Sequence, residues 1–167
     1  MSEIIGKLED FSLTKSPKPH GAIHQIGIIG FGSMGQEIAK TISQHGFDVV
    51  CLDLDEKRVA GGLDGITRML DTEILRWGMT NSEKRLIMSR IKGTVEYKNL
   101  ADCDIVFEAI NSRKPGTSLE IRKEILQNAE KYVRRDAILA SNTATLMISD
   151  LASGLEYPVR AVGLHFM

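Results

Sequence analysis

The sequence lacks a large net charge, long apolar runs and more than a pair of cysteines. Its 21 lysines and arginines nearly balance 22 acidic residues, giving a net charge of −1, so it has no basic field to attract nucleic acid or an anionic membrane. No apolar run approaches the ~18 residues of a membrane span. The first ten residues lack the basic-then-apolar pattern of a signal peptide. These absences predict a protein with neither a nucleic acid nor a membrane as its partner.

The two cysteines, Cys51 and Cys103, lie in or beside predicted strands and do not have the spacing of metal ligands. This placement favours reduced core residues of a cytoplasmic protein, and the alternative is a disulfide between them. The sequence therefore indicates no metal site.

A single domain is the expectation for 167 residues of which 43% are hydrophobic. Residues 1–24 match no packed element, and the stretch 16–21 has the proline and glycine content of a turn or linker. We therefore expect an N-terminal extension at 1–24 and a folded domain at 25–167.

A glycine-rich segment, Gly-Phe-Gly-Ser-Met-Gly, lies between an apolar run at 26–29 and a helical pattern at 36–45. A second apolar run at 49–52 leads to Asp53, which follows Gly30 by 23 residues (53 minus 30), near the expected ~20. In this fingerprint the three glycines permit a tight turn, close approach of a pyrophosphate, and close helix packing. The phosphates lie at the helix N-terminus, where free N–H groups attract them.

An acidic residue at position 53 can accept hydrogen bonds from both ribose hydroxyls and would repel a 2′-phosphate, so the motif predicts NAD rather than NADP. The alternative is a doubly wound fold whose turn binds nothing. The residues of this motif expected to contact the cofactor are Gly30, Phe31, Gly32, Ser33, Met34, Gly35 and Asp53.

The rest of the chain alternates between short apolar runs and helical patterns, which predicts an α/β, Rossmann-type doubly wound fold. Its sheet is expected to be mostly parallel, with helices on both faces and a long helical excursion at 55–90 after the second strand. For the helix at 118–132, the apolar period predicts a core face of Ile121, Ile125 and Ala129. Strands are expected at 26–30, 48–52, 92–95, 104–109, 137–140 and 160–164. Helices are expected at 34–45, 55–77, 80–90, 118–132 and 147–153.

With these segments in place, residues 26–167 resemble the NAD-binding domain of the 3-hydroxyacyl-CoA dehydrogenase family. Besides the glycine motif, Asp53 and the helical excursion, the resemblance is carried by the segments 90–94 (RIKGT), 101–109 (ADCDIVFEA), 140–143 (ASNT) and 163–167 (GLHFM). It implies oxidation of an L-3-hydroxyacyl-CoA to the 3-ketoacyl-CoA with hydride transfer to NAD. It also implies a second, all-helical domain that forms much of the acyl-CoA site and the dimer contact.

The resemblance also assigns site residues. His165 matches the family's general base for the 3-hydroxyl, and Asn142 matches an asparagine that assists at the substrate oxygen. Ala109, Ile110, Arg122 and Asn142 complete the expected cofactor contacts, with Arg122 at the position of a family lysine. From the residues alone, the favoured interpretation of His165 is a histidine at a strand end that hydrogen-bonds the backbone.

Several departures separate this chain from the family. Ala144 occupies the position of the catalytic serine, and an alanine donates no hydrogen bond. The loop 110–118 is longer and carries Arg113 and Lys114, which favours a solvated surface loop over contact with a different acyl carrier. The chain stops at Met167, before the strand with the orienting glutamate and before the helical domain.

We therefore expect NAD binding with little or no dehydrogenase activity from this chain alone. A non-catalytic NAD(H)-binding or scaffold module and a different hydroxy-acid or imine substrate are the alternatives. The apolar surface that the second domain would meet predicts cover by self-association, by a partner chain, or by residues 1–24 folding back.

Overall fold

The computed structural model describes residues 23–111 and 118–166. The predicted fold-back of the N-terminal extension and the basic loop residues Arg113 and Lys114 lie outside these residues.

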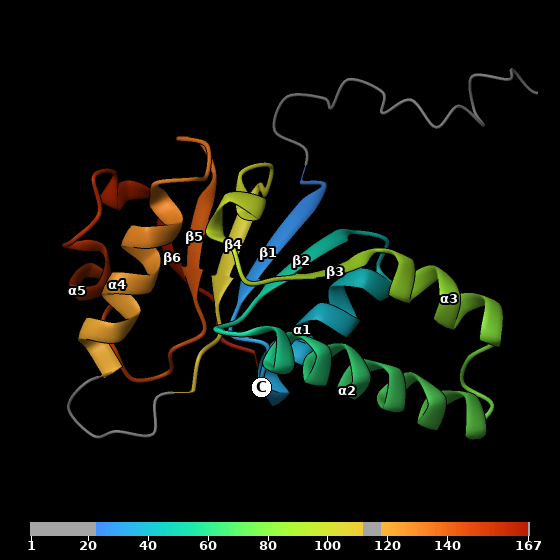
Figure 1. Ribbon diagram of the computed structural model, residues 1–167. Helices are drawn as coiled ribbons and strands as arrows, with labels where there is room; N and C mark the ends of the chain where they lie inside the picture. Colours follow the sequence, from blue (N-terminus) through green and yellow to red (C-terminus); the bar gives the residue numbers. More distant parts are fainter. Residues whose placement is uncertain (1–22, 112–117, 167) are drawn as a thin grey trace, which may run out of the picture.

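One parallel sheet dominates the described part of the chain (Figure 1). All five neighbouring strand pairs are parallel, as the short apolar runs predict. The strand order is β3-β2-β1-β4-β5-β6, so it reverses between β1 and β4, where an open α/β sheet forms its ligand-binding crevice. The strands are β1 (Gln25–Ile29), β2 (Asp48–Leu52), β3 (Ile91–Thr94), β4 (Ile105–Glu108), β5 (Ile138–Ser141) and β6 (Ala161–Gly163).

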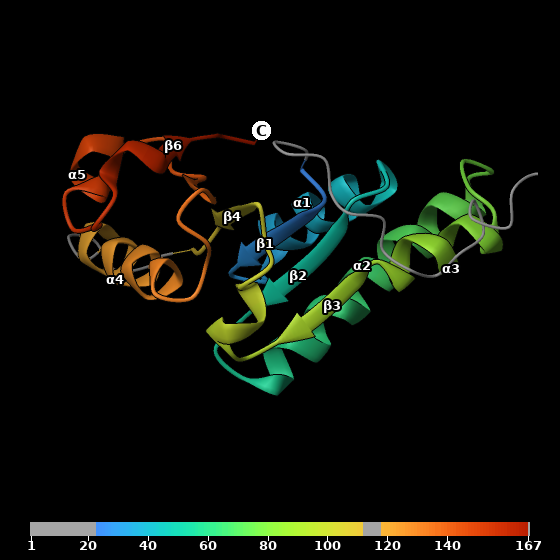
Figure 2. The ribbon, with the colours of Figure 1, turned by 90° about the horizontal axis from the view of Figure 1, so that it is seen from above.

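Helices cover both faces of the sheet (Figures 1 and 2). On one face lie α1 (Ser33–Gln44), α2 (Glu56–Leu75) and α3 (Asn81–Ser89); on the other lie α4 (Ser118–Glu130) and α5 (Ile148–Ala152). Two short 3-10 helices that the sequence pattern did not predict, η2 (Tyr97–Leu100) and η3 (Pro158–Arg160), precede β4 and β6. The doubly wound fold and the long excursion after the second strand are thereby confirmed.

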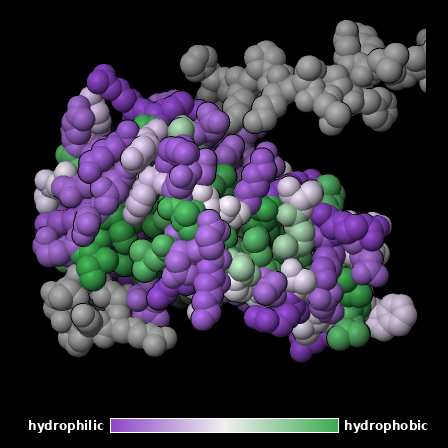
Figure 3. Space-filling model, viewed as in Figure 1, coloured by the Kyte–Doolittle hydropathy of each residue, from purple (hydrophilic) through white to green (hydrophobic). Residues whose placement is uncertain are grey.

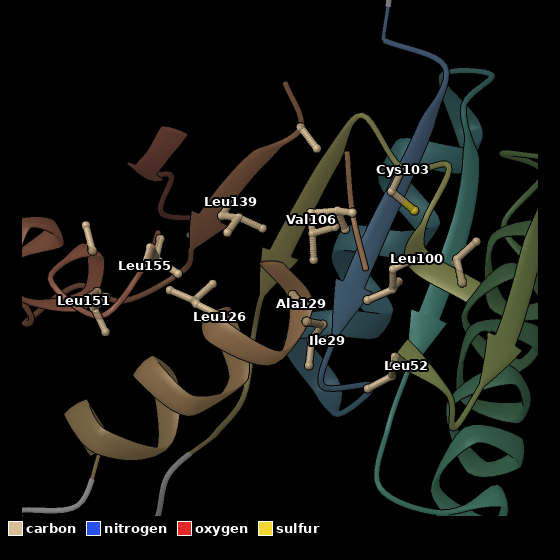
Figure 4. Packing of buried hydrophobic residues seen from close by; sticks show 14 residues of the cluster. Ile29, Leu52, Leu100, Cys103, Val106, Leu126, Ala129, Leu139, Leu151 and Leu155 are labelled. Atoms are coloured by element: carbon tan, nitrogen blue, oxygen red, sulfur yellow. The ribbon is translucent and has the colours of Figure 1, made fainter. Parts of the chain in front are cut away.

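Successive residues of the central strands pack into different cores, because successive side chains of a strand point to opposite faces. In β2, Val49 and Cys51 pack in the core under α1 and α2, whereas Val50 and Leu52 pack in the core under α4. Figure 4 shows the second core, in which Leu126 of α4 points toward the strands.

The core-facing side of α4 differs from the predicted one. Arg122, Leu126 and Ala129 are its buried residues, whereas Ile121 is 37% exposed. Of the predicted face, Ala129 is buried and Ile125 packs half-buried against the core, so the prediction is wrong only for Ile121. Arg122 takes a core position because it meets a buried carboxylate, described below, and a hydrophobic pattern does not register a buried charge pair.

The helical excursion is a capped hairpin of α2 and α3. Asp55 caps α2 by accepting a hydrogen bond from the Arg58 backbone N–H at 2.8 Å. At the start of α3, Thr80 and Glu83 form a reciprocal capping box, with the Glu83 carboxylate accepting from the Thr80 backbone N–H at 2.7 Å. An ion pair between Lys84 of α3 and Asp71 of α2, with an N–O distance of 2.5 Å, links the two helices.

A buried ion pair fixes the far end of α4 to the segment before β6. The Glu130 and Arg160 side chains are only 10% and 6% exposed, and Arg160 donates to Glu130 at 3.0 Å. Glu130 also accepts from the backbone N–H groups of Glu156, at 2.8 Å, and Tyr157, at 3.1 Å. Burial alone raises the pKa of Glu130, but these hydrogen bonds and the guanidinium hold that pKa below its usual range.

Both cysteines are buried thiols, as predicted. Burial, with a smaller contribution from Cys103, raises the pKa of the Cys51 thiol, which keeps it protonated and unreactive. Within residues 23–111 and 118–166, no helix combines the length and the apolar character needed to cross a membrane. In the space-filling view, apolar surface appears in patches across the middle of the face, separated by hydrophilic side chains (Figure 3).

Candidate functional site: a dinucleotide crevice

The turn after β1 lies against the start of the loop after β4. Gly30 has a φ of +98°, a left-handed conformation that favours glycine. Its backbone N–H donates to the Leu52 carbonyl at 2.8 Å. A Cβ at Gly30 would lie 3.0 Å from backbone atoms of Ala109 and Ile110. The first glycine therefore permits both the turn and the close approach of the two loops.

The other two glycines of the motif have opposite surroundings. A Cβ at Gly35 would lie 2.0 Å from the Gly30 carbonyl oxygen, so any side chain there would displace the turn. A Cβ at Gly32 would have no atom of the described residues within 4 Å. No described contact requires a glycine at position 32. The lack of a side chain there leaves open space beside the backbone, where a pyrophosphate is expected to approach.

Both backbone polar groups of Phe31 are held in place. The Phe31 N–H donates to Asp53 Oδ2 at 2.8 Å, and the Phe31 carbonyl accepts from Gln36 Nε2 at 3.0 Å. The Phe31 side chain is 2% exposed and lies under Gly62 of α2, where a Cβ would come within 2.2 Å of the ring. These contacts fix the orientation of the glycine turn.

Asp53 is thus placed beside the turn, as the fingerprint predicts. Its Oδ1 accepts from the Leu54 N–H at 2.7 Å. Because a carboxylate has about four acceptor positions, both oxygens retain capacity for ribose hydroxyls.

The N-terminus of α1 lies at the open space beside Gly32. Gly32 is its N-cap, and no side chain caps the helix in the part of the chain that the structure describes. The first N–H groups of a helix have no partner within the helix, so the amides of Ser33 and Met34 can bind an anion.

The opposite wall of the crevice is built around Glu108, the last residue of β4, which is fully buried. Its carboxylate forms an ion pair with Arg122 of α4. It also accepts from the Ile110 N–H at 2.8 Å and from the Ser141 hydroxyl at 2.6 Å. Arg122 in turn donates to the Ile110 carbonyl at 2.9 Å and to Ser118 Oγ at 3.2 Å.

Arg122 and Ile110 were predicted as site residues from the sequence, whereas Glu108, Ser141 and Gln36 were not. One signal was available: in the register of β4 and β5, Glu108 faces Ser141, so two polar residues end adjacent apolar strands. Arg122 stays a predicted cofactor contact, and the described partners of its guanidinium are Glu108, Ile110 and Ser118.

The structure brings His165 and Asn142 together at the ends of β5 and β6. His165 Nδ1 lies 3.3 Å from the Asn142 carbonyl oxygen, and Asn142 Oδ1 accepts from the Phe166 N–H at 2.7 Å. The Phe166 ring packs edge-on against Phe107 of β4, with 5.5 Å between ring centroids. The His165 side chain is exposed.

Next to this pair, the loop after β5 offers no hydroxyl at position 144. Ala144 is exposed. Thr143 Oγ1 accepts from the backbone N–H groups of Thr145, at 3.3 Å, and Leu146, at 3.2 Å, so the Thr143 hydroxyl stabilises the turn.

Comparison with known proteins agrees with this geometry. The family model described as "3-hydroxyacyl-CoA dehydrogenase, NAD binding domain" matches residues 25–167. This chain belongs to the 3-hydroxyacyl-CoA dehydrogenase family. Its cofactor is accordingly NAD, and the matched residues are the NAD-binding domain of that family.

The chain is similar to known proteins both in sequence and in structure. A 3-hydroxybutyryl-CoA dehydrogenase of Bradyrhizobium diazoefficiens is 32% identical over 145 residues, which cover 87% of this chain and 48% of the relative. A fatty acid oxidation complex subunit alpha of Psychrobacter arcticus is 31% identical, covering 95% of this chain and 22% of that protein. The crystal structure of (S)-3-hydroxybutyryl-CoA dehydrogenase from Ralstonia eutropha matches with a TM-score of 0.81 and 32% identity, covering 87% of this chain and 50% of that one. The chain thus spans half or less of the length of these relatives.

Proposed function

We propose that this chain binds NAD(H) along the carboxyl edge of its sheet and forms the dinucleotide-binding half of an L-3-hydroxyacyl-CoA dehydrogenase. The observation that carries the proposal is the hydrogen bond of 2.8 Å between the Phe31 N–H and Asp53, next to the N-terminus of α1, which none of the described side chains caps. It holds a carboxylate for the ribose and free amides for the pyrophosphate at neighbouring positions.

The cofactor roles follow the geometry of the crevice. Asp53 accepts the adenosine ribose hydroxyls, and the amides of Ser33 and Met34 bind the pyrophosphate above the open space at Gly32. The dinucleotide then continues across the switch point toward Ile110 and Asn142. When bound, NAD accepts the hydride from the substrate carbon that bears the hydroxyl.

In the proposed reaction His165 takes the proton of the 3-hydroxyl as general base. Asn142 Oδ1 already accepts from Phe166, which leaves the Asn142 amide nitrogen to donate to the substrate oxygen. The adjacent placement of these two residues supports their assignment.

We further propose that this polypeptide by itself turns over substrate slowly. The exposed His165 ring contacts a backbone carbonyl, and a solvated base held this way lacks the preorganised, water-excluded surroundings that make proton transfer efficient. Ala144 supplies no donor for the substrate oxygen. Val162 of the edge strand β6 and Leu164 just after it are 40% and 46% exposed, and they form an apolar surface suited to a second copy or a partner chain.

A mutation beside the turn tests the cofactor assignment. Asp53→Asn keeps an acceptor for the Phe31 N–H but removes the negative charge, so we expect NADH to bind more weakly and NADPH to bind relatively better. Asp55→Asn is the matched control, because asparagine preserves the helix cap at a neighbouring exposed position. Fluorescence titrations with both cofactors measure the ratio of affinities. An unchanged ratio in Asp53→Asn would contradict the assignment.

A non-catalytic NAD(H)-binding module is the second candidate, favoured by the alanine at position 144. Oxidation of NADH on addition of acetoacetyl-CoA separates the two. Slow oxidation that His165→Gln abolishes is expected for the dehydrogenase half. Saturable NADH binding without any oxidation would establish the non-catalytic module instead.

A further inference from the structure

The buried carboxylate of Glu108 connects three segments that meet at the crevice. It binds the Ile110 N–H at 2.8 Å in the loop after β4, the Ser141 hydroxyl at 2.6 Å at the end of β5, and the Arg122 guanidinium on α4. The Glu108 backbone carbonyl also accepts from the Asn142 N–H at 2.9 Å. One side chain therefore joins the two loops that flank the crevice on the side away from Asp53.

Both backbone polar groups of Ile110 are hydrogen-bonded by this ion pair. Its N–H donates to Glu108 at 2.8 Å and its carbonyl accepts from Arg122 at 2.9 Å. The Ile110 backbone also lies close to the glycine turn, since a Cβ on Gly30 would lie 3.0 Å from the Ile110 nitrogen. The ion pair thus fixes the spacing between the glycine turn and the loop that faces it.

Stability alone is a weak reason for such a pair. Two charges removed from water lose their hydration, and an apolar pair of similar volume is often as stable. The Glu108 and Arg122 side chains are 0% and 11% exposed, so the loss of hydration is nearly complete. What an apolar pair does not provide is a set of directional hydrogen bonds to the Ile110 peptide and to Ser141.

We propose that Glu108 is a positioning residue that does not touch the cofactor. Through its bonds to Arg122 and Ser141, it fixes the geometry of the half of the crevice that binds nicotinamide. This proposal rests on the proposed function, because Asp53 and the α1 N-terminus assign the adenosine ribose and the pyrophosphate to the other half. It predicts that removing the network weakens the binding of ligands that carry nicotinamide and spares ligands that lack it.

The test compares NADH with ADP-ribose, which lacks the nicotinamide ring, by calorimetric titration of the full chain. The variant Glu108→Gln/Arg122→Met removes both buried charges together and so leaves neither unpaired. We expect its NADH affinity to fall by at least about tenfold, with ADP-ribose affinity unchanged.

The matched control is Glu130→Gln/Arg160→Met. It removes a second buried ion pair, with side chains 10% and 6% exposed, that anchors the other end of α4. We expect this control to lower the unfolding temperature while both ligands bind as in the parent chain. A purely structural role of the Glu108 pair would make the two double variants behave alike.

Because Arg122 is itself a predicted cofactor contact, Ser141→Ala, which leaves Arg122 in place, separates positioning by Glu108 from the loss of a direct contact. It also keeps the proposal falsifiable if the Glu108 variant does not fold. It removes the hydrogen bond of 2.6 Å that the Ser141 hydroxyl donates to Glu108 and the one of 3.4 Å that it accepts from the Thr143 N–H, and we expect a smaller loss confined to NADH. Unchanged NADH affinity in the folded variants, or equal losses of NADH and ADP-ribose, would overturn the proposal. If the parent chain binds neither ligand, the proposed function itself is wrong and the proposal falls with it.

Discussion

Replacing Gly32 with alanine separates cofactor binding from folding. Gly32 has φ −73° and ψ −168°, extended backbone that alanine also adopts. A Cβ there meets no described atom within 4 Å. Alanine is a poorer N-cap than glycine by about 1 kcal/mol, but it also lowers the conformational entropy of the unfolded chain, a gain of about 0.4–1 kcal/mol that offsets this cost. We therefore expect Gly32→Ala to unfold at the same temperature as the parent chain.

The added methyl group nevertheless occupies the space that the pyrophosphate needs in order to reach the backbone. We expect NADH affinity to fall by at least about tenfold, or about 1.4 kcal/mol of binding free energy. Fluorescence titration with NADH and thermal unfolding of the same samples measure the two quantities independently.

Gly35→Ala is the control with the opposite outcome. Its Cβ would lie 2.0 Å from the Gly30 carbonyl oxygen, a backbone atom that moves only with the turn. Overpacking costs about 1–3 kcal/mol or more, which exceeds the helix-propensity gain of about 1 kcal/mol at best. We expect a lower unfolding temperature by about 2–4 °C for each kcal/mol lost.

Two results would refute this reasoning. NADH binding to Gly32→Ala with the affinity of the parent chain would mean that the dinucleotide does not pass over this residue. An unfolding temperature lowered as much by Gly32→Ala as by Gly35→Ala would mean that the space beside position 32 is not open.

The remaining predictions concern stability. Gly62→Ala would place its Cβ 2.2 Å from the Phe31 ring and is expected to destabilise the fold by about 1–3 kcal/mol. The Cβ of Gly61→Ala would meet no described atom within 4 Å, so this variant should stabilise the fold by about 0.5–1 kcal/mol. Urea unfolding measures both, and equal effects would contradict the packing of α2. Thr80→Ala should cost about 1 kcal/mol by removing the capping box, and no change would mean that α3 is not capped. Hydrogen bonds hold the pKa of Glu130 below 4.5 despite its burial. The stabilisation that ionised Glu130 contributes is therefore present above pH 4.5 and is lost as the pH falls through the depressed pKa. The stability difference between the parent chain and Glu130→Gln should shrink at acid pH, and a pH-independent difference would refute this prediction.

The parts of the site that follow one another in the chain were predictable from the sequence. The glycine motif and Asp53 belong to one strand-turn-helix-strand unit, whose spacing fixes their relative positions before any long-range contact forms. Strands and helices were likewise found from short apolar runs and from the helical period, because both reflect which face is buried.

The opposite wall of the crevice was not predictable in this way. Glu108, Arg122 and Ser141 come from three separate elements, and only the folded sheet brings them together. Their burial also misled the reading of α4, since an arginine counts as a solvent-facing residue in any hydrophobic pattern. The role of the glutamate therefore became visible only with the register of β4 and β5.

Parallel titrations of the purified chain with NADH and NADPH, followed by cofactor fluorescence, test the central claim most directly. The account predicts saturable binding of NADH, with NADPH clearly weaker because the Asp53 carboxylate repels a 2′-phosphate. Binding of neither cofactor, or tighter binding of NADPH, would contradict it.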